Sequence, residues 1–388
     1  MSVKTCSVFS QLLSLVDRNR FGGHVKSLGT EKHSKRLKCW EQFVAMLFCQ
    51  VAHCKSLREI DQGLRSCEGK LQHLGLTEAP KRSTLAYANA NRDWRLYERV
   101  FYEVLASCRE VAPKKKFRFR NKLLSLDATV IDLCASVFDW AHFRKTKGAV
   151  KLHLLLDHEG YLPTFASITE GAVHDVKFAQ GLKLPKGSVV AMDRGYYDFE
   201  LFSRWTQAGV WFVSRLKSNA DYYVVKENPV PPGGVILADE VIGFAGAKAQ
   251  KQCPQLMRRV VVWDEEKLES IELITNHLDF AASTVAAIYK ERWQIELFFK
   301  AIKQNLKVKT FVGTSANALH IQIWTALIAI LLIKYLQFRS RLKWALSNLV
   351  ALVRLNLFTY RDLWAWIDDP FATPPESPPL EQGVLAGF

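Results

Sequence analysis

The pattern of hydrophobic and polar positions changes along the chain. Over residues 1–110 the apolar residues recur at helical spacing, and no alternating run predicts a strand. The expected helices cover residues 7–16, 39–51, 56–64, a stretch from 83, and 94–108. Ser56 followed by Glu59 is a capping-box pattern that marks a helix start. The pattern therefore predicts an all-helical N-terminal domain.

From residue 123 the chain changes to short apolar runs rich in β-branched residues, which predict strands. The expected strands are 123–133, 150–156, 161–169, 188–192 and 210–216, with helices at 174–182 and 199–207. The predicted order is β-β-β-α-β-α-β. Residues 219–279 are rich in Val, Tyr and Ile with clusters of turn residues, and predict a small β-rich insertion outside the main sheet.

Residues 284–309 predict one long helix, because they contain neither Gly nor Pro. Its apolar residues form one stripe, the expected buried face: Ile288, Ile295, Phe299, Ile302 and Leu306. Its polar residues form a neighbouring stripe: Tyr289, Arg292, Glu296, Lys300 and Lys303. A solvated face with an i,i+4 pair is one interpretation. A single acid among cations also suits a carboxylate that holds a metal while its neighbours hold phosphates.

The spacing Tyr-x2-Arg-x3-Glu-x6-Lys, at Tyr289, Arg292, Glu296 and Lys303, resembles the signature of a known family. This family is the DDE transposases of the insertion-sequence-four group, bacterial cut-and-paste enzymes. The Asp-Arg-Gly-Tyr sequence at 193–196 is similarly specific, and the resemblance covers roughly residues 7–366. It implies an α/β, RNase H-like mixed sheet with a β-rich insertion, an N-terminal helical domain and C-terminal helices.

The resemblance implies three catalytic carboxylates, of which Glu296 is the third. Asp127, flanked by Ala and Thr in the first strand, matches the first, and Asp193, after the fourth strand, matches the second. A carboxylate inside a buried strand is costly unless it is paired or bound to metal. Asp132 is the competing candidate for the first acid. Asp127, Asp193 and Glu296 are also the expected ligands of two Mg²⁺ ions, with Mn²⁺ as a substitute.

The resemblance further implies that the cations and the Tyr around these acids bind DNA. The expected DNA-binding residues are Tyr289, Arg292, Lys300, Lys303, Arg194, Arg215 and Lys217. The N-terminal domain is basic as well, and we expect it to bind the DNA end. A plain helical cap on the next domain is the alternative. The basic stretch 112–120 is either a backbone-tracking linker or an exposed connector.

Composition supports a polyanionic partner. The 388 residues contain 53 Lys and Arg against 38 Asp and Glu, a formal charge of +15. The eight Cys form no Cys-x2-Cys pair, which argues against a zinc site. The longest apolar run, 321–333, is too short to span a bilayer and predicts a buried helix. With no signal peptide at its start, the chain is expected in the bacterial cytoplasm at the nucleoid, without membrane contact.

The resemblance therefore implies a DNA transposase that cleaves transposon ends with a metal ion and transfers the strands. The expected partners are duplex DNA, as terminal inverted repeats and as target, and a second copy of the chain in the DNA complex. An RNase H-like host nuclease and a non-catalytic DNA-binding descendant are the alternatives. The expected segments are 1–110, 111–218, 219–279, 280–310, 311–369 and a disordered tail 370–388.

Overall fold

The computed structural model describes residues 6–372, except for positions 33, 35, 68, 114–120, 134–137, 139, 141, 145–146, 173 and 306–310. The expected basic linker and the expected disordered tail therefore lie largely outside the described residues. Leu306 of the predicted buried stripe lies outside them as well.

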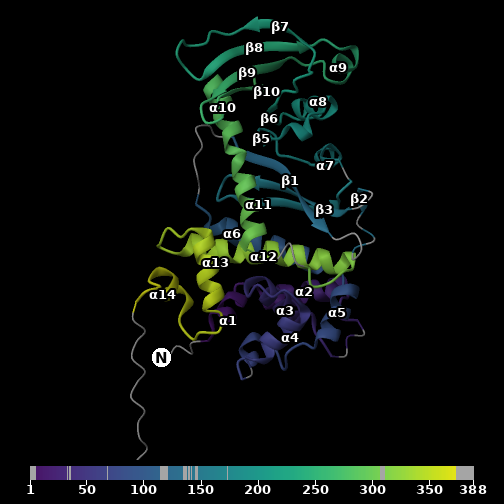
Figure 1. Ribbon diagram of the computed structural model, residues 1–388, viewed down its shortest axis with the longest axis vertical. Coiled ribbons are helices and arrows are strands. Elements are labelled where there is room, and N and C mark those ends of the chain that lie inside the picture. The colour runs from purple at the N-terminus through teal and green to yellow at the C-terminus, as the bar shows by residue number, and fades with distance from the viewer. Residues whose placement is uncertain are drawn as a thin grey trace, which may run out of the picture.

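The centre of the molecule is a mixed β-sheet built around β1 (Leu123–Leu133) (Figure 1). β1 pairs antiparallel with β3 (Lys147–Asp157) and parallel with β5 (Val189–Met192). Beyond these, β4 (Leu162–Glu170) pairs with β3, and β6 (Trp211–Arg215) runs parallel to β5. The order β4-β3-β1-β5-β6, in which only β3 is reversed, is that of the RNase H-like fold. The predicted fold class is therefore confirmed.

Alternation along β1 and β5 gives the sheet two different faces. Leu124, Leu126, Val190 and Met192 pack on the face covered by α7 (Asp175–Gly181) and α8 (Phe199–Gln207). Their neighbours in the sequence, Leu123, Val189 and Ala191, face the other side. A helix such as α8 is needed between β5 and β6, because parallel strands cannot be joined by a tight turn. The short strand β2 (His142–Arg144) pairs with β3 at the sheet edge.

The insertion between β6 and the Glu296 helix extends the same sheet. Its elements are β7 (Tyr222–Glu227), β8 (Ile236–Phe244), α9 (Ala247–Gln252), β9 (Met257–Asp264) and β10 (Glu269–Thr275). The β-rich content is as predicted, but the expectation that these strands lie outside the main sheet is wrong. β10 pairs antiparallel with β6, from Leu273 opposite Arg215 to Thr275 opposite Val213. This pairing covers the backbone groups of β6, which would otherwise form an open sheet edge.

The predicted long helix is divided into α10 (Ala282–Glu291) and α11 (Trp293–Asn305). Arg292 lies at the junction, where the N–H of Arg292 bonds the carbonyl of Tyr289 at 3.1 Å and the N–H of Ile295 bonds that of Arg292 at 3.2 Å. These i→i−3 bonds tighten the helix locally. The expectation of one unbroken helix is wrong here because the halves pack on different cores: Ile288 on the sheet beside β5, and Ile295 on the helical base.

The buried stripe predicted on this helix pair is confirmed as far as the structure describes it. Ile288 and Ile295 are 0% exposed, Ile302 is 2% exposed and Phe299 is 5% exposed. The stripe therefore continues across the break. The polar stripe beside it lies along β1, since Arg292 contacts Asp127 and Lys303 contacts Val130.

A helical base lies below the sheet (Figure 1). Its N-terminal helices are α1 (Val8–Leu13), α2 (Arg18–Leu28), α3 (Cys39–Val51), α4 (Leu57–Arg65), the short η1 (Leu71–Leu74), α5 (Arg82–Asn91) and α6 (Arg95–Val111). The predicted start of α4 is confirmed, because the Ser56 hydroxyl accepts the N–H of Glu59. The C-terminal helices are α12 (Ala316–Arg339), α13 (Leu346–Leu355) and α14 (Leu363–Asp368).

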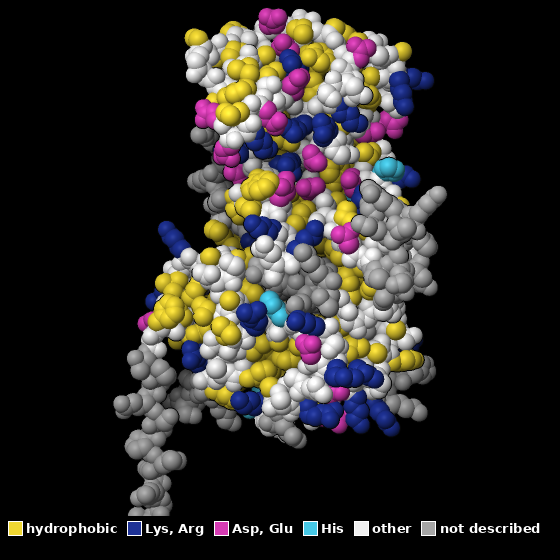
Figure 2. Space-filling model, in the orientation of Figure 1, with side chains coloured by type: hydrophobic (Ala, Val, Ile, Leu, Met, Phe, Trp, Pro, Cys, Tyr) yellow, Lys and Arg dark blue, Asp and Glu magenta, His cyan; other side chains and the backbone are white. Residues whose placement is uncertain are grey.

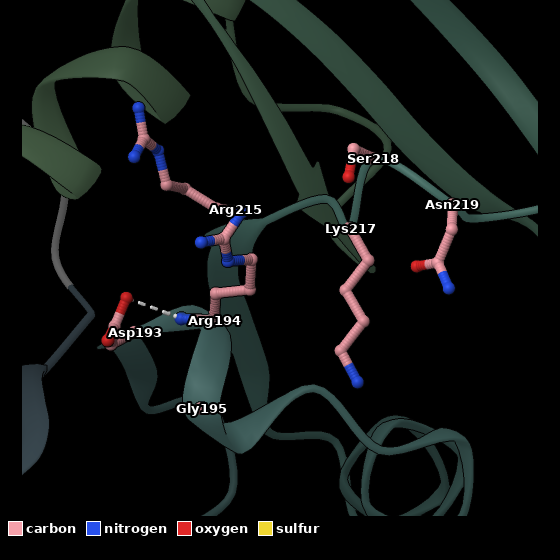
Figure 3. A pocket seen from close by; sticks show the side chains of 7 residues that line it. All are labelled: Asp193, Arg194, Gly195, Arg215, Lys217, Ser218 and Asn219. Carbon is pink, nitrogen blue, oxygen red and sulfur yellow. Dashed lines mark hydrogen bonds between the residues drawn. The ribbon is translucent and has the colours of Figure 1, made fainter.

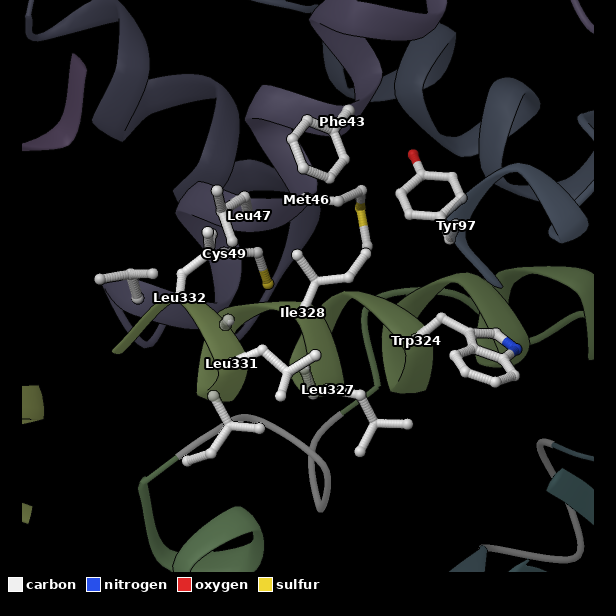
Figure 4. Close-up of a cluster of buried hydrophobic side chains, with 14 of the residues drawn as sticks. Phe43, Met46, Leu47, Cys49, Tyr97, Trp324, Leu327, Ile328, Leu331 and Leu332 are labelled. Atoms are coloured by element: carbon white, nitrogen blue, oxygen red, sulfur yellow. The ribbon is translucent and has the colours of Figure 1, made fainter. Parts of the chain in front are cut away.

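α12 runs through the middle of this base and joins its two parts. In Figure 4, Ile328 of α12 lies against Met46 of α3, and Trp324 lies toward Tyr97 of α6. By length and composition it is the one helix among the described residues that is able to cross a membrane, but 83% of its apolar window is buried inside the fold. The prediction of a buried helix is confirmed. The N-terminal and C-terminal helices thus share one core.

Candidate active site

The pairing of β1 with β5 brings two of the predicted acids to the same place. The last parallel pair joins Leu126 to Met192, so Asp127 and Asp193 are the next residues on the two strands. Both follow the alternation of Leu123 and Val189, and so belong to the face that α10 covers. The carboxyl ends of parallel strands are where α/β sheets form their sites. Register alone therefore makes these two acids neighbours.

Asp193 caps a short helix at the end of β5. Its Oδ1 accepts the N–H of Arg194 at 2.6 Å, the bond drawn in Figure 3, and it precedes η2 (Arg194–Tyr196). The Ser214 hydroxyl on β6 donates to the Asp193 carbonyl at 3.3 Å. The first bond orients the Asp193 side chain, and the second ties its backbone to β6.

Arg292 connects the first predicted acid to the third. Its Nη1 lies 3.5 Å from Oδ2 of Asp127, and its Nη2 lies 2.6 Å from Oε1 of Glu296. The Arg292 side chain is 15% exposed, and its buried Nε donates to no acceptor among the described residues. The guanidinium therefore bridges β1 and α11 and still has a donor to offer.

Burial and neighbouring charges raise the pKa of Asp127 to about 6. Desolvation is the largest cause, and the charges of Asp193 and Glu296 raise the pKa further. The N–H of Ala128 and the guanidinium of Arg292 act in the opposite direction. The pKa shift shows that the carboxylate of Asp127 is influenced by the charges of both other acids.

Within the described ranges, no three His, Cys, Asp or Glu side chains already stand as a metal-ligand group. In this arrangement the Arg292 guanidinium supplies the positive charge between Asp127 and Glu296. The three acids are thus electrostatic neighbours rather than a preassembled ligand shell.

Asp132, the competing candidate, lies elsewhere. It is five residues further along β1, about 17 Å away at strand rise, and an odd spacing turns it to the opposite face. It is exposed and stands opposite Ala149 of β3. The structure brings Asp127, and not Asp132, beside Asp193.

Two hollows with cationic walls flank the acids. The first, of about 540 Å³, is lined by Asp193 together with Arg194, Gly195, Arg215, Lys217, Ser218 and Asn219 (Figure 3). Arg215 also pairs with Glu269 at 3.1 Å, and Lys217 lies over the Tyr197 ring. All three predicted cations of this region therefore surround one hollow beside Asp193.

The second hollow, of about 420 Å³, lies along α11. Its walls include Asp127, Glu296, Lys300 and Lys303. Lys300 is exposed, whereas the Lys303 ammonium donates to the Val130 carbonyl at 3.1 Å. Tyr289 lies partly buried with Arg292 over its ring, and burial raises its pKa. The predicted polar stripe thus gathers around the acids.

A hydrogen-bonded group behind the acids was not predicted. The Ser125 hydroxyl lies 2.7 Å from Nε2 of His158, whose Nδ1 lies 3.3 Å from Oε2 of Glu291. The Tyr161 hydroxyl donates to the same Glu291 oxygen at 3.3 Å. Ser125 is fully buried and the His158 side chain is 7% exposed, whereas the Glu291 side chain is 31% exposed. This group ties the α10–α11 junction to β1 and to the β3–β4 turn, and no fixed spacing in the sequence signals it.

Comparison with known proteins adds an independent finding. Residues 118–332 match the family model described as transposase DDE domain, and residues 4–77 match a domain of unknown function (DUF4372). A putative transposase, y4zB of Sinorhizobium fredii, is 30% identical over 304 residues, 77% of this chain and 83% of that protein. A probable transposase for insertion sequence element IS5377 of Geobacillus stearothermophilus is 28% identical, over 66% of this chain and 67% of that protein.

One solved structure aligns with most of the chain. It is a piggyBac transposase synaptic complex with hairpin DNA, with a TM-score of 0.46 and 9% identity over 96% of this chain and 82% of that chain.

The raised pKa of Asp127 predicts how stability depends on pH. Its folded-state value of about 6 exceeds the ordinary 3.8, so the folded protein binds more protons between these values. Stability should therefore fall as pH rises from about 4 to 6. Asp127→Asn should remove this fall and raise the free energy of unfolding at pH 8 by about 1–3 kcal/mol. The loss of the ion pair between Asp127 and Arg292 would reduce this gain. Urea unfolding of both proteins at about pH 4 and at pH 8, with chelator present, measures the change in the free energy of unfolding.

Asp132→Asn is the matched control and should leave the pH profile as in the wild type. An Asp127→Asn profile parallel to that of the wild type would show that burial of Asp127 carries no such penalty.

The group around His158 predicts a stability effect at the helix junction. Glu291→Ala removes the carboxylate that His158 and Tyr161 both contact, and should lower the free energy of unfolding by about 1–3 kcal/mol. Glu159→Ala, an exposed acid beside His158, should change stability by less than about 0.5 kcal/mol. Chemical unfolding of both variants is the measurement, and equal losses would contradict a specific role for Glu291.

Proposed function

Because the chain belongs to the transposases with a DDE domain, we propose that Asp127, Asp193 and Glu296 are the catalytic carboxylates of this enzyme. The observation that carries the assignment is the register of β1 with β5, together with the Arg292 bridge to Glu296. The enzyme is a transposase of the insertion-sequence type. We propose the cleavage of transposon ends and the strand transfer as the two reactions of this one site.

The donor set fits a hard divalent cation. Three carboxylates offer oxygen ligands. Burial and, to a smaller extent, the charges of the other two acids raise the pKa of Asp127, and a cation would offset both effects. Asp127, Asp193 and Glu296 would hold two Mg²⁺ ions, or Mn²⁺ in their place. When bound, the ions would stabilise negative charge on the attacking and leaving oxygens of the phosphodiester.

Arg292 has two roles in this proposal. Without DNA it balances the charge of Asp127 and Glu296. A DNA phosphate offers the guanidinium a competing partner, and its buried Nε is a donor that no described acceptor uses. Movement of Arg292 to the phosphate would leave both carboxylates open to the cation. Ionised Asp127 is required for this, so protons compete with the cation at Asp127 as the pH falls.

The remaining cations of the site would hold the DNA on either side of the cut. Lys300 and Lys303 line the α11 hollow, and Arg194, Arg215 and Lys217 line the hollow beside Asp193. Tyr289 lies against Arg292, which contacts both Asp127 and Glu296. Because the acids sit between these two groups, a backbone that crosses both hollows passes over the carboxylates. Duplex DNA carrying the terminal inverted repeat, and later the target, is the proposed partner.

Three further features belong to the proposal rather than to the geometry. The enzyme would act as a homodimer on paired ends, in the bacterial cytoplasm at the nucleoid. The helical segment 1–110 would bind the transposon end away from the cut. Its cations Lys81 and Arg82 are exposed, which supports this role.

Glu296→Gln tests the catalytic assignment. It keeps the shape of the side chain but removes the charge that would hold a cation. Mg²⁺-dependent nicking of a duplex from the end of the element should fall by at least about 100-fold, since even outer-shell partners of metal ligands cost about 10–100-fold. Binding of the same duplex should change by less than about 3-fold, because no cation that contacts phosphate is removed.

Lys300→Ala is the complementary variant, since it removes a phosphate contact and no carboxylate. It should weaken the DNA complex and reduce the slope of log affinity against log salt by about one. Gel-shift titration at several salt concentrations, beside the nicking assay, measures both variants. Near wild-type nicking by Glu296→Gln would refute its role as a metal ligand. Unchanged binding by Lys300→Ala would show a solvated face instead.

A further inference from the structure

The outward face of α5 has an unusual composition. Its exposed residues are Arg82, Ser83, Ala86, Tyr87, Ala90 and Asn91. Tyr87 is 72% exposed, and residues 79–92 contain no acid. A surface helix normally carries charges of both signs on its solvent face. This helix instead presents small and uncharged polar side chains beside an exposed aromatic ring.

The opposite face of α5 is held rigidly. Leu85 is fully buried, and the amide of buried Asn89 accepts from Gln42 of α3 at 2.8 Å. Asn317 at the start of α12 donates to the carbonyls of Asn89 and Arg92 at 2.8 and 2.6 Å. Arg92 itself turns inward and bonds Gln42. The outward face is therefore presented on a fixed platform, which suits recognition.

Cations gather beside the N-terminus of α5. A hollow of about 380 Å³ is lined by Lys55, Arg58 and Arg82 together with Ser56, Leu57, Phe311 and Val312. None of these three cationic side chains pairs with an acid in the part of the chain that the structure describes. Two acids lie beside the hollow. Glu59 accepts the backbone N–H of Lys55 at 2.8 Å, and Asp61 pairs with Arg65 at 2.8 Å and accepts the N–H of Arg82 at 3.3 Å. Figure 2 shows Lys and Arg side chains gathered over the lower part of the helical base.

This hollow lies close to the active-site helix. α11 ends at Asn305, and Phe311 and Val312 already line the hollow. Six residues span at most about 20 Å, and Glu296 lies about 14 Å along α11 from its end. The hollow is therefore within about 34 Å of Glu296, which is about one turn of duplex DNA. One DNA end is long enough to reach both.

We propose that the outward face of α5 reads the major groove of the transposon-end duplex, while Lys55 and Arg58 hold phosphates beside it. The major groove, about 12 Å wide, admits a helix, and the small Ala86 and Ala90 permit close approach. Ser83, Tyr87 and Asn91 supply donors and acceptors for base edges. Cations at the end of the helix supply the backbone contacts that fix its register. The identity of the DNA rests on the proposed function.

The experiment uses the full chain in chelator, so that no cleavage occurs. The probes are a duplex of about four turns, roughly 40 base pairs, from the end of the element, and a shuffled duplex of the same composition. Tyr87→Ala and Asn91→Ala should each lower affinity for the end duplex by about 5- to 100-fold. Affinity for the shuffled duplex should change by less than about 2-fold, because base contacts carry the sequence preference.

Lys55→Ala and Arg58→Ala should behave differently. They should weaken both duplexes equally and reduce the salt slope by about one each. Lys343→Ala is the matched control for these cations. The start of α12 contacts α5, whereas Lys343 follows the other end of α12, which is about 36 Å long. Tyr223→Ala, at 50% exposure on β7, is the control for Tyr87. Both controls should bind as the wild type does.

The outcomes separate this inference from the proposed catalysis. If the wild type nicks the end duplex with Mg²⁺ but Tyr87→Ala and Asn91→Ala keep the full preference for it, the role of α5 is wrong and the catalytic assignment stands. If the preference for the end duplex depends on Tyr87 and Asn91 but the wild type does not nick it, the proposed role of α5 is upheld and the catalytic proposal fails. Binding of a polyglutamate peptide, lost in Lys55→Ala and Arg58→Ala while both duplexes bind normally, would overturn the inference in favour of an acidic protein partner.

Discussion

The guanidinium of Arg292 balances two carboxylates that come from different elements, Asp127 on β1 and Glu296 on α11. Burial disfavours an ionised carboxylate, and this raises the pKa of Asp127 to about 6 even with Arg292 beside it. Arg292 reaches both acids from the junction between two helices that pack on different cores. The position of that junction therefore determines where the third acid lies relative to the first. Every role assigned to the polar stripe depends on this placement.

Several unrelated contacts hold the junction in place. The register of β1 with β5 makes Asp127 and Asp193 neighbours, and the alternation of both strands turns them toward α10. The group of Ser125, His158 and Glu291 ties the junction to the interior of the sheet. α12 supports the lower end of α11 through the shared core of the helical base. Rigid support of this kind is what a site needs if its side chains are to exchange partners without losing their position.

The sequence predicted those features that depend on local pattern. Strand periodicity located β1 and β5, and apolar spacing located the buried side of α10 and α11. It failed where the outcome depends on contacts between distant residues. No Gly or Pro near Arg292 signals the break between α10 and α11, because the break results from the packing of the two helices on different cores. Nothing in residues 219–279 tells that β10 pairs with the edge of β6. His158 and Glu291 are far apart in the sequence, so their contact has no spacing that a pattern search recognises.

The site has a negative centre with cations beside it. Three carboxylates against one guanidinium leave the centre negative, and a DNA backbone would be repelled there. The cations stand to either side, in the hollow of Arg194, Arg215 and Lys217 and along α11 at Lys300 and Lys303. A polyanion is therefore attracted to the flanks first and reaches the acids only when cations compensate their charge. Binding along the flanks and charge balance at the centre are thus separate requirements, met by separate residues of one surface.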